Sequence, residues 1–398
     1  MNLSSAVVLA AGEGRRLRPL TKHRPKPMLP AANRPILSYV LDALIDAGID
    51  DIHLVVGYKR DRVQNHFGTT YRNRTITYHH QRKQLGSGHA LLQAADALDS
   101  DFVVVNGDQL IHHEMVDDVQ NAHTVEDVAT LAVVESEEAP EYGAVRMDDE
   151  RVTELVERPH DDSYRLLNAG VYAFAPSFFA EIESTPRQHG ELSLSDTIAG
   201  LTGAKGAVRG VVTDGVWQDA TYPWDLLSLS RSVLRSADLV DKPETTPGVY
   251  ADPTATIHED ATIQPPAIVG PDSVVGPQAV VGPNAALGRN VTVGAGAVVR
   301  DSVVDGDTRI GANTTLVDAV TGQGVSLGSG TTVPGGQGDV TVGTTVHTDV
   351  RLGSVLADRV RVDGGATVAP GVLVGPNARL HAGVTLDKNV DEDVEVVD

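Results

Sequence analysis

The second half of the chain carries a short repeat. From residue 255 an aliphatic side chain recurs every six residues, with corners such as Gly270-Pro271 and Gly282-Pro283 between the repeats. A fixed short period predicts a solenoid, in which each repeat stacks on its neighbours and only the stack buries a core. Each hexad would form one face of a triangular prism, with its aliphatic residue directed at the axis. The repeat positions are Ile257, Ile263, Val269, Val275, Val281, Leu287, Val293 and Val299.

The repeat is interrupted and then returns. After one five-residue step the phase resumes at Val304, Ile310 and Leu316, and it is clear again at Val362, Val368, Val374, Leu380 and Leu386. The pattern resembles the left-handed parallel β-helix of hexapeptide-repeat proteins, whose prisms commonly trimerise. We therefore expect a β-helix over 251–390 and a homotrimer. A helix and linker over 229–250 would precede the β-helix, and an acidic tail would follow over 391–398.

The first half alternates between two kinds of segment. Short β-rich apolar runs lie at 6–10, 52–56, 102–105 and 129–134, whereas 36–47 and 89–98 carry helical spacing. This alternation predicts an α/β domain over 1–228, with a Rossmann-like, mostly parallel sheet. Ligands of such sheets bind at the carboxyl ends of the strands.

A glycine-containing loop follows the first predicted strand. Backbone N–H groups in a strand-to-helix turn can bind anionic oxygens, and Arg15 and Lys26 add full positive charge. The loop lacks the Gly-Lys-Ser/Thr ending of a P-loop. It nevertheless predicts a site for a nucleoside triphosphate, with Arg15 and Lys26 as catalytic cations. The loop residues expected to contact the nucleotide are Leu9, Ala11, Gly12 and Gly14.

Two aspartates are candidate metal ligands. Asp108 follows the strand predicted at 102–105, where a carboxylate could hold a cation that bridges phosphate oxygens. Asp219 lies between Trp217 and Trp224. Magnesium held by one or two carboxylates and by substrate phosphates would suit this pair. In the alternative interpretation the tryptophans are core anchors around a surface aspartate.

Taken together, these strings resemble a known family. The string L-A-A-G-x-G-x-R-x-x-P from Leu9 to Pro19, followed by P-K-P-M, is similar to the signature of sugar-phosphate nucleotidyltransferases. Residues 81–90 resemble the Q-x-x-Q-L-G-T-G-H-A stretch of the bacterial N-acetylglucosamine-1-phosphate uridylyltransferase. That resemblance implies a pyrimidine pocket, and W-x-D-x-x-x-P-W resembles the family segment with the second metal-binding aspartate. The implied base-side residues are Gln81, Gly86 and Ser87, and the implied sugar-side residues are Gly143, Glu157 and Asn168.

The resemblance implies transfer of a nucleotide to a sugar. The expected substrates are UTP or dTTP and the 1-phosphate of N-acetylglucosamine or glucose, with Mg²⁺ as cofactor. Many relatives that use glucose 1-phosphate have Lys where this chain has Arg158, so the sugar stays open. One alternative is a noncatalytic regulatory subunit that binds a nucleotide sugar.

Another alternative is a bifunctional enzyme with an added acetyl-coenzyme A-dependent N-acetyltransferase. The catalytic His and the Asn of such relatives are absent from the matching positions, 314–318 and 328–335. Without a base, nothing would take the proton from an attacking amine. We therefore expect the β-helix to be structural or regulatory.

The charge balance limits the partners. A formal net charge of −22 disfavours a general nucleic-acid or anionic-membrane binder, so the anion-binding cations must be local. Scarce Lys and absent Cys are typical of a protein from a high-salt cytoplasm, where a Debye length of roughly 3 Å at 1 M salt screens surface repulsion. The sequence shows neither a cationic leader nor a long apolar run. We expect a cytoplasmic protein without a signal peptide or membrane span.

Overall fold

The structure is a computed structural model that describes residues 3–202, 207–236 and 239–397. It contains two compact units. The first unit comprises Met1–Glu13, Pro25–Met28 and Ile36–Gln218. The second comprises Gly14–Arg24, Leu29–Pro35 and Asp219–Asp398. The second unit thus combines the loop after the first strand with the repeat region, and it starts earlier than the boundary expected at residue 228.

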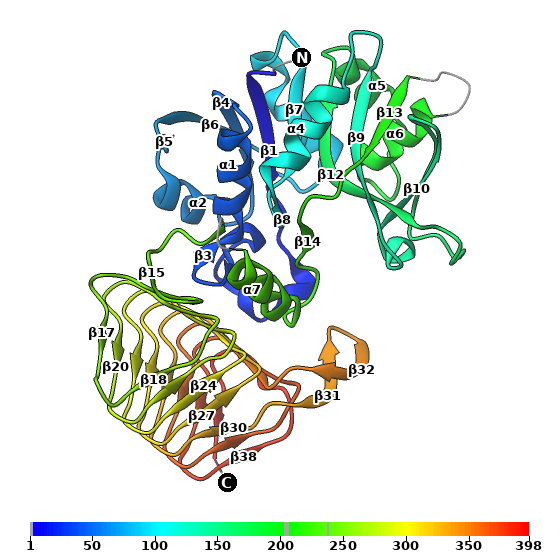
Figure 1. The fold of residues 1–398 in the computed structure, drawn as a ribbon. Coiled ribbons are helices and arrows are strands. Elements are labelled where there is room, and N and C mark those ends of the chain that lie inside the picture. The colour runs from blue at the N-terminus through cyan, green and yellow to red at the C-terminus, as the bar shows by residue number, and fades with distance from the viewer. Residues whose placement is uncertain (1–2, 203–206, 237–238, 398) are drawn as a thin grey trace. The chain divides into compact units, whose positions relative to one another are not determined.

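The first unit is built on a ten-stranded sheet in the order β10-β11-β13-β9-β12-β7-β1-β4-β6-β5 (Figure 1). The strands β7, β1, β4 and β6 run parallel, as the strand–helix alternation predicts. β12 is antiparallel to both β7 and β9, and β5 is antiparallel to β6. The strands are β1 (Ser5–Ala10), β4 (Asp51–Val56), β5 (Thr70–Tyr71), β6 (Arg74–His80), β7 (Phe102–Asn106), β9 (Ala129–Glu135), β10 (Gly143–Asp148), β11 (Arg151–Glu157), β12 (Leu166–Phe174) and β13 (Val208–Val212).

Helices cover both faces of this sheet. Successive side chains of a strand point to opposite faces, so Ala6 and Val8 enter one core and Val7 enters the other. The first core contains α1 (Ile36–Asp46), α2 (Arg60–Phe67) and α4 (His113–Ala122). The second contains α3 (Ser87–Leu91), α5 (Phe178–Ser184) and α6 (Leu194–Leu201).

The helix predicted over 89–98 differs from the observed one. The α-helical part, α3, ends at Leu91, and the chain continues as a 3₁₀-helix, η4 (Leu92–Ala97). Apolar residues three positions apart share a face in both helix types, as buried Leu91 and Ala94 do here. The apolar spacing alone therefore does not distinguish the two types.

The repeat region of the second unit is a left-handed parallel β-helix, as predicted. Its strands form three sheets, one for each face of the prism (Figure 1). Val269, Val281, Leu287 and Val293 are fully buried along its axis. The first sheet contains β15 (Glu244–Thr246), β16 (Val249–Ala251), β19 (Ala267–Val269), β22 (Ala285–Leu287), β25 (Val303–Val304), β28 (Ala319–Thr321), β33 (Ser354–Leu356) and β36 (Val372–Val374). The second sheet contains β17 (Thr256–Ile257), β20 (Val274–Val275), β23 (Thr292–Val293), β26 (Arg309–Ile310), β29 (Ser326–Leu327), β34 (Arg361–Val362), β37 (Arg379–Leu380) and β39 (Glu395–Val396). The third sheet contains β18 (Thr262–Ile263), β21 (Val280–Val281), β24 (Val298–Arg300), β27 (Thr315–Val317), β30 (Thr332–Val333), β35 (Thr367–Val368) and β38 (Thr385–Leu386).

The gap in the repeat between Leu316 and Val362 has two structural causes. Thr321 takes an interior position, opposite Val304 and Leu356 in the neighbouring coils, and a threonine does not match an aliphatic pattern. A hairpin of β31 (Gln337–Val342) and β32 (Thr345–Arg351) is then inserted between β30 and β33. The coils themselves continue through the gap.

The ends of the β-helix also differ from their expected limits. The expected linker overlaps α7 (Asp225–Arg235), which begins before residue 229, and it also reaches the first strands of one face, β15 and β16. The segment expected as an acidic tail adds β39 to β37, so the described part of 391–398 extends the β-helix. A short hairpin of β2 (Pro30–Ala31) and β3 (Arg34–Pro35) also belongs to this unit. Across the described residues, no helix combines the length and apolarity needed to span a bilayer.

A buried histidine predicts acid sensitivity of the first unit. The His123 side chain is fully buried with Nδ1 2.8 Å from Thr130 Oγ1, and burial lowers its pKa below 6.5, against the opposing effect of Asp101. The unfolded chain therefore binds this proton more readily than the folded protein. The contribution of neutral His123 to the free energy of unfolding is therefore fully present above about pH 6.5, and it is lost as the pH falls below that value. We expect His123→Asn to reduce the drop in thermal midpoint between about pH 7.5 and pH 5.

The matched control for this variant is His160→Asn. His160 is exposed in the same unit, so its replacement should leave the pH dependence unchanged. An equal drop in the wild-type protein and in His123→Asn would contradict the prediction.

Candidate functional site

The parallel strands bring several predicted residues to one edge of the sheet. Gly12 follows β1, Gln81 follows β6 and Asp108 follows β7. Because β7, β1, β4 and β6 are parallel neighbours, their carboxyl ends lie together, as the sequence predicts. The backbone at this edge is tightly packed, since Leu9 O accepts from Gly107 N at 2.9 Å and Ala11 O accepts from Tyr58 N at 3.3 Å.

Lys26 and Asp108 form an ion pair at this edge. Lys26 Nζ lies 2.8 Å from Asp108 Oδ2, and the side chains are 11 % and 33 % exposed. The two residues are far apart in sequence, and both were predicted as site residues on independent grounds. The ammonium lies against a carboxylate whose hard oxygens could also accept a divalent cation.

The loop after β1 contains three 3₁₀ turns, where the sequence predicts a strand-to-helix turn. These are η1 (Arg15–Leu17), η2 (Leu20–Lys22) and η3 (Lys26–Met28). Pro19, Pro25 and Pro27 explain the difference, because proline lacks an N–H and disrupts an α-helix. Gly14 adopts a left-handed conformation with φ 67° before η1, which favours glycine.

Gln81 is held in place by its own amide group. Its Nε2 donates to Gly86 O at 2.9 Å and contacts His89 Nδ1 at 3.0 Å. Burial and, to a smaller extent, Arg187 lower the pKa of His89, so the ring is neutral at neutral pH and accepts this hydrogen bond at Nδ1. An amide side chain can in general pair with a base through both its donor and its acceptor. In the structure the amide nitrogen of Gln81 makes both of these contacts within the protein, and the side-chain carbonyl makes neither of them.

The glycine-serine turn after Gln81 packs against a second segment. Leu192 N donates to Leu85 O at 2.7 Å, and Gly88 N donates to Leu192 O at 2.8 Å. Ser87 Oγ accepts from Leu194 N at 3.0 Å, at the start of α6. Gly86 has φ 98°, and a Cβ there would overlap the carbonyl of Leu192. Residues 191–194 thus buttress the predicted base pocket.

The predicted sugar-side residues lie together on adjoining strands. Gly143 in β10 pairs with Glu157 in β11, and a Cβ on Gly143 would lie 3.2 Å from Glu157 Oε1 and 3.5 Å from Asn168 Cβ. Asn168 Nδ2 donates to Tyr172 OH at 2.8 Å, and Asn168 Oδ1 accepts from Gly170 N at 3.2 Å. Burial raises the pKa of Tyr172, so its hydroxyl stays neutral. The side chains of Glu157 and Asn168 thus form a polar cluster, and Gly143 contributes no side chain to it.

Asp219 ends β14 (Trp217–Asp219), a strand that pairs with β8 (Gln109–Ile111). Its Oδ2 accepts from Thr221 Oγ1 at 2.7 Å. Trp217 packs against the apolar core of the first unit and donates from Nε1 to Ala169 O at 2.8 Å, so for this tryptophan the core-anchor interpretation describes the contacts. Asp108 belongs to the first unit and Asp219 to the second.

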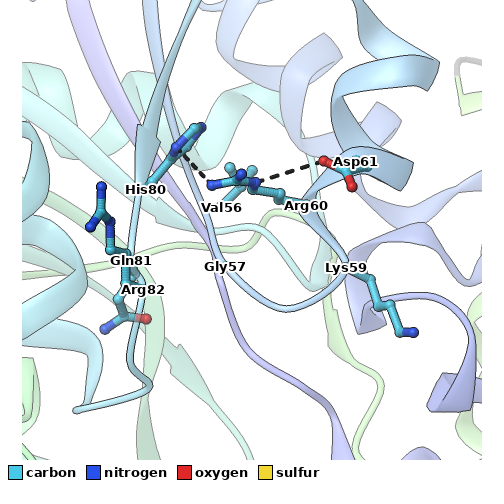
Figure 2. Close-up of a pocket in the computed structure, with 8 residues that line it drawn as sticks. All are labelled: Val56, Gly57, Lys59, Arg60, Asp61, His80, Gln81 and Arg82. Atoms are coloured by element: carbon cyan, nitrogen blue, oxygen red, sulfur yellow. Dashed lines mark hydrogen bonds and ion pairs between the residues drawn. The ribbon is translucent and has the colours of Figure 1, made fainter.

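A basic pocket of about 460 Å³ adjoins Gln81. Figure 2 shows Arg60 between His80 and Asp61, with Lys59 directed away from them. Lys59, Arg60 and Arg82 place cations here although the whole chain carries a net charge of −22. This pocket is not among the sequence predictions. Its signal in the sequence is the cationic pair Lys59-Arg60, which comes shortly after β4 and falls at the same strand edge as the glycine loop.

Two other groups were missed. Arg16 stands at the arginine position of the L-A-A-G-x-G-x-R string, and its guanidinium lies 5.9 Å from the centre of the Tyr222 ring. At the start of α4, His112, His113 and Glu114 place potential metal-binding atoms within 4.8 Å of one another. Consecutive residues give no periodic signal, so a pattern search would find this group only by residue type.

Comparisons with known proteins agree with these observations. Residues 5–236 match the family model described as nucleotidyl transferase, and residues 245–362 match the GMPPB C-terminal domain. The chain is 32 % identical over 404 residues to the "Bifunctional protein GlmU" of Methanococcus maripaludis, covering 98 % of this chain and 96 % of that protein.

Two proteins of Haloferax volcanii match the first part of the chain. The "UTP--glucose-1-phosphate uridylyltransferase AglF" is 37 % identical, covering 55 % of this chain and 92 % of that protein. The "Low-salt glycan biosynthesis nucleotidyltransferase Agl11" is 36 % identical, covering 58 % of this chain and 67 % of that protein.

The packing of Gly86 predicts the effect of a single methyl group. We expect Gly86→Ala to weaken nucleotide binding and to lower the thermal midpoint. The Cβ would meet the backbone of Leu192, and a side chain at φ 98° and ψ 169° adds strain of roughly 1–3 kcal/mol. Gly190→Ala is the control, since Gly190 has φ 86° with open space around its Cβ position. Nucleotide titration and thermal unfolding measure both effects, and equal losses in the two variants would contradict a steric role for Gly86.

Proposed function

The chain belongs to the family of sugar-1-phosphate nucleotidyltransferases, and we propose that it joins UTP or dTTP to the 1-phosphate of N-acetylglucosamine or glucose. The products would be a nucleotide sugar and pyrophosphate. The observation that carries this proposal is the Lys26–Asp108 pair at the sheet edge where Gly12 and Gln81 also lie.

The reaction needs no nucleophile from the protein. An oxygen of the sugar phosphate forms a bond to the α-phosphorus of the triphosphate, and the bond from that phosphorus to the bridging oxygen breaks in line. The electron pair leaves with pyrophosphate. Catalysis then depends on alignment of the two substrates and on neutralisation of the negative charge that they bring together.

The charged residues of the loop serve that neutralisation. Lys26, already held against Asp108, would contact the phosphates, and Arg15 and its neighbour Arg16 would add positive charge from η1. The hard oxygen donors of Asp108 and Asp219 fit Mg²⁺, which would neutralise phosphate oxygens when bound. Backbone N–H groups near Gly12 and Gly14 would complete the phosphate site.

The remaining predicted residues would orient the substrates. The carbonyl of Gln81 would accept the N3–H of uracil or thymine, and Gly86 and Ser87 would keep the backbone close to the base. Glu157 and Asn168 would bind sugar hydroxyls or an N-acetyl group, with Gly143 leaving room for the ring. We further propose that the β-helix is noncatalytic and forms a trimer.

Pyrophosphate release tests the function directly. The assay uses high salt and Mg²⁺, and it crosses UTP and dTTP with the 1-phosphates of glucose, N-acetylglucosamine and glucosamine. Release with one clear pair supports the proposal and names the substrates. Silence across all pairs, with tight binding of a nucleotide sugar, would instead favour a regulatory subunit.

Lys26 offers the sharpest single test. We expect Lys26→Ala to lower kcat on the order of 10²- to 10³-fold, because the variant loses a charge that stabilises the transition state. The thermal midpoint should change little, since the ammonium is at the edge of the sheet and outside both cores. Lys388→Ala, which removes an exposed charge from the β-helix, is the control. An unchanged kcat in Lys26→Ala would remove this residue from the mechanism.

A further inference from the structure

Arg24 joins the loop of the second unit to the β-helix. The loop 14–24 belongs to this unit together with the coils, and Arg24 is its last residue. Its side chain is only 12 % exposed, and its two terminal nitrogens donate separately to Asp305 and Asp358. One guanidinium therefore spans carboxylates that are far apart in sequence.

The β-helix presents these carboxylates in fixed positions. Asp305 follows β25 and Asp358 follows β33, with β28 stacked between them. Asp305 Oδ1 accepts from Gly306 N at 2.7 Å, and Asp358 Oδ1 accepts from Gln323 N at 2.9 Å. Gly322, after β28, leaves the intervening coil without a side chain, and a Cβ there would overlap Asp358. The acceptors are thus oriented by backbone groups before the arginine binds.

A buried guanidinium needs both partners. Burial opposes the charge on Arg24, but the carboxylates of Asp305 and Asp358 outweigh it and raise the pKa. A planar guanidinium can address two carboxylates at once, whereas a lysine ammonium is a single point of charge. Lys22, two residues before Arg24, adds a more exposed contact, with Nζ 2.8 Å from Glu392 Oε2.

The anchored segment leads in both directions to residues of the proposed reaction. Thr21 Oγ1 donates to Gly14 O at 2.8 Å, which ties the anchored end of the loop to the turn that precedes Arg15. On the other side, only Pro25 separates Arg24 from Lys26, and the ring of a proline restricts the backbone between them. A shift at Arg24 would therefore reach both proposed catalytic cations.

We propose that Arg24 is a positioning residue, and that its pairs with Asp305 and Asp358 make nucleotidyl transfer depend on the β-helix. This inference rests on the proposed function for its catalytic part. The β-helix would then act on the reaction without supplying a group that touches substrate. Misplacement of catalytic groups by about 1 Å can cost on the order of 10²-fold in rate, so loss of the anchor should appear in kcat.

The test compares Arg24→Gln with the wild-type full-length protein. We expect faster hydrogen exchange at the amides of 14–24 and a kcat lowered on the order of 10- to 100-fold, with KM for the triphosphate changed less. Arg24→Lys keeps the charge and should recover part of the rate, which also covers the case that the glutamine variant folds poorly. Asp305→Asn removes the carboxylate charge of the same ion pair, so it should also give faster hydrogen exchange at the amides of 14–24.

Arg379→Gln is the matched control, because Arg379 Nη2 pairs with Asp363 Oδ2 at 3.0 Å within the β-helix. Unchanged exchange at 14–24 in Arg24→Gln would overturn the inference, as would faster exchange with an unchanged kcat. An equal loss of kcat in Arg379→Gln would also overturn it, since the effect would then be general weakening of the coils. A wild-type protein inactive with every substrate pair would refute the proposed function, and the exchange comparison would still decide whether Arg24 anchors the loop.

Discussion

The parallel pairing of β7, β1, β4 and β6 is the constraint on which the candidate site depends. Backbone hydrogen bonds fix these strands side by side and in register, so the residues that follow each strand emerge at one edge. That edge gathers the glycine loop, Gln81 and Asp108 from segments that are distant in sequence. The antiparallel strand β12 runs back from the same edge and brings Asn168 to it. One pattern of strand pairing thus accounts for both the base side and the sugar side of the proposed site.

The β-helix is built from a short repeat, so the same contacts recur from coil to coil. From Val269 to Leu386 the coils bury an aliphatic side chain at the repeat position of each face, with Thr321 as the exception. The corners turn where Asn or Asp adopts a left-handed backbone conformation, as at Asn284 and Asn290. The corner side chains also connect the coils, since Asn284 Nδ2 donates to Asp301 at 2.9 Å and Asn290 Nδ2 donates to Asp307 at 2.7 Å. The stack can therefore accept a hairpin between β30 and β33 without losing its core.

Charge is distributed unevenly in this acidic protein. The net charge of −22 would repel a nucleoside triphosphate from most of the surface, yet cations are concentrated at the carboxyl edge of the sheet and along the loop 14–24. Several of them are paired with carboxylates, as Lys26 is with Asp108 and Arg24 is with Asp305 and Asp358. Such pairs hold the cations in place. At molar salt, exposed pairs are screened, whereas a buried pair such as that of Arg24 keeps its strength.

The sequence by itself determined the two architectures and the identity of most candidate residues. The six-residue repeat and the alternation of strands and helices are both local patterns. The repeat predicted the β-helix, and the alternation predicted the parallel strands and the residues at their ends. The 3₁₀ turns of the loop also have a local cause, because its prolines disrupt the expected helix. Two features depended on tertiary structure. Thr321 occupies an interior position of the β-helix although its residue type does not match the aliphatic pattern. The pairing of Arg24 with Asp305 and Asp358 joins residues hundreds of positions apart. The hexad period predicts stacked coils, but no local pattern indicates which coils the loop residue Arg24 meets.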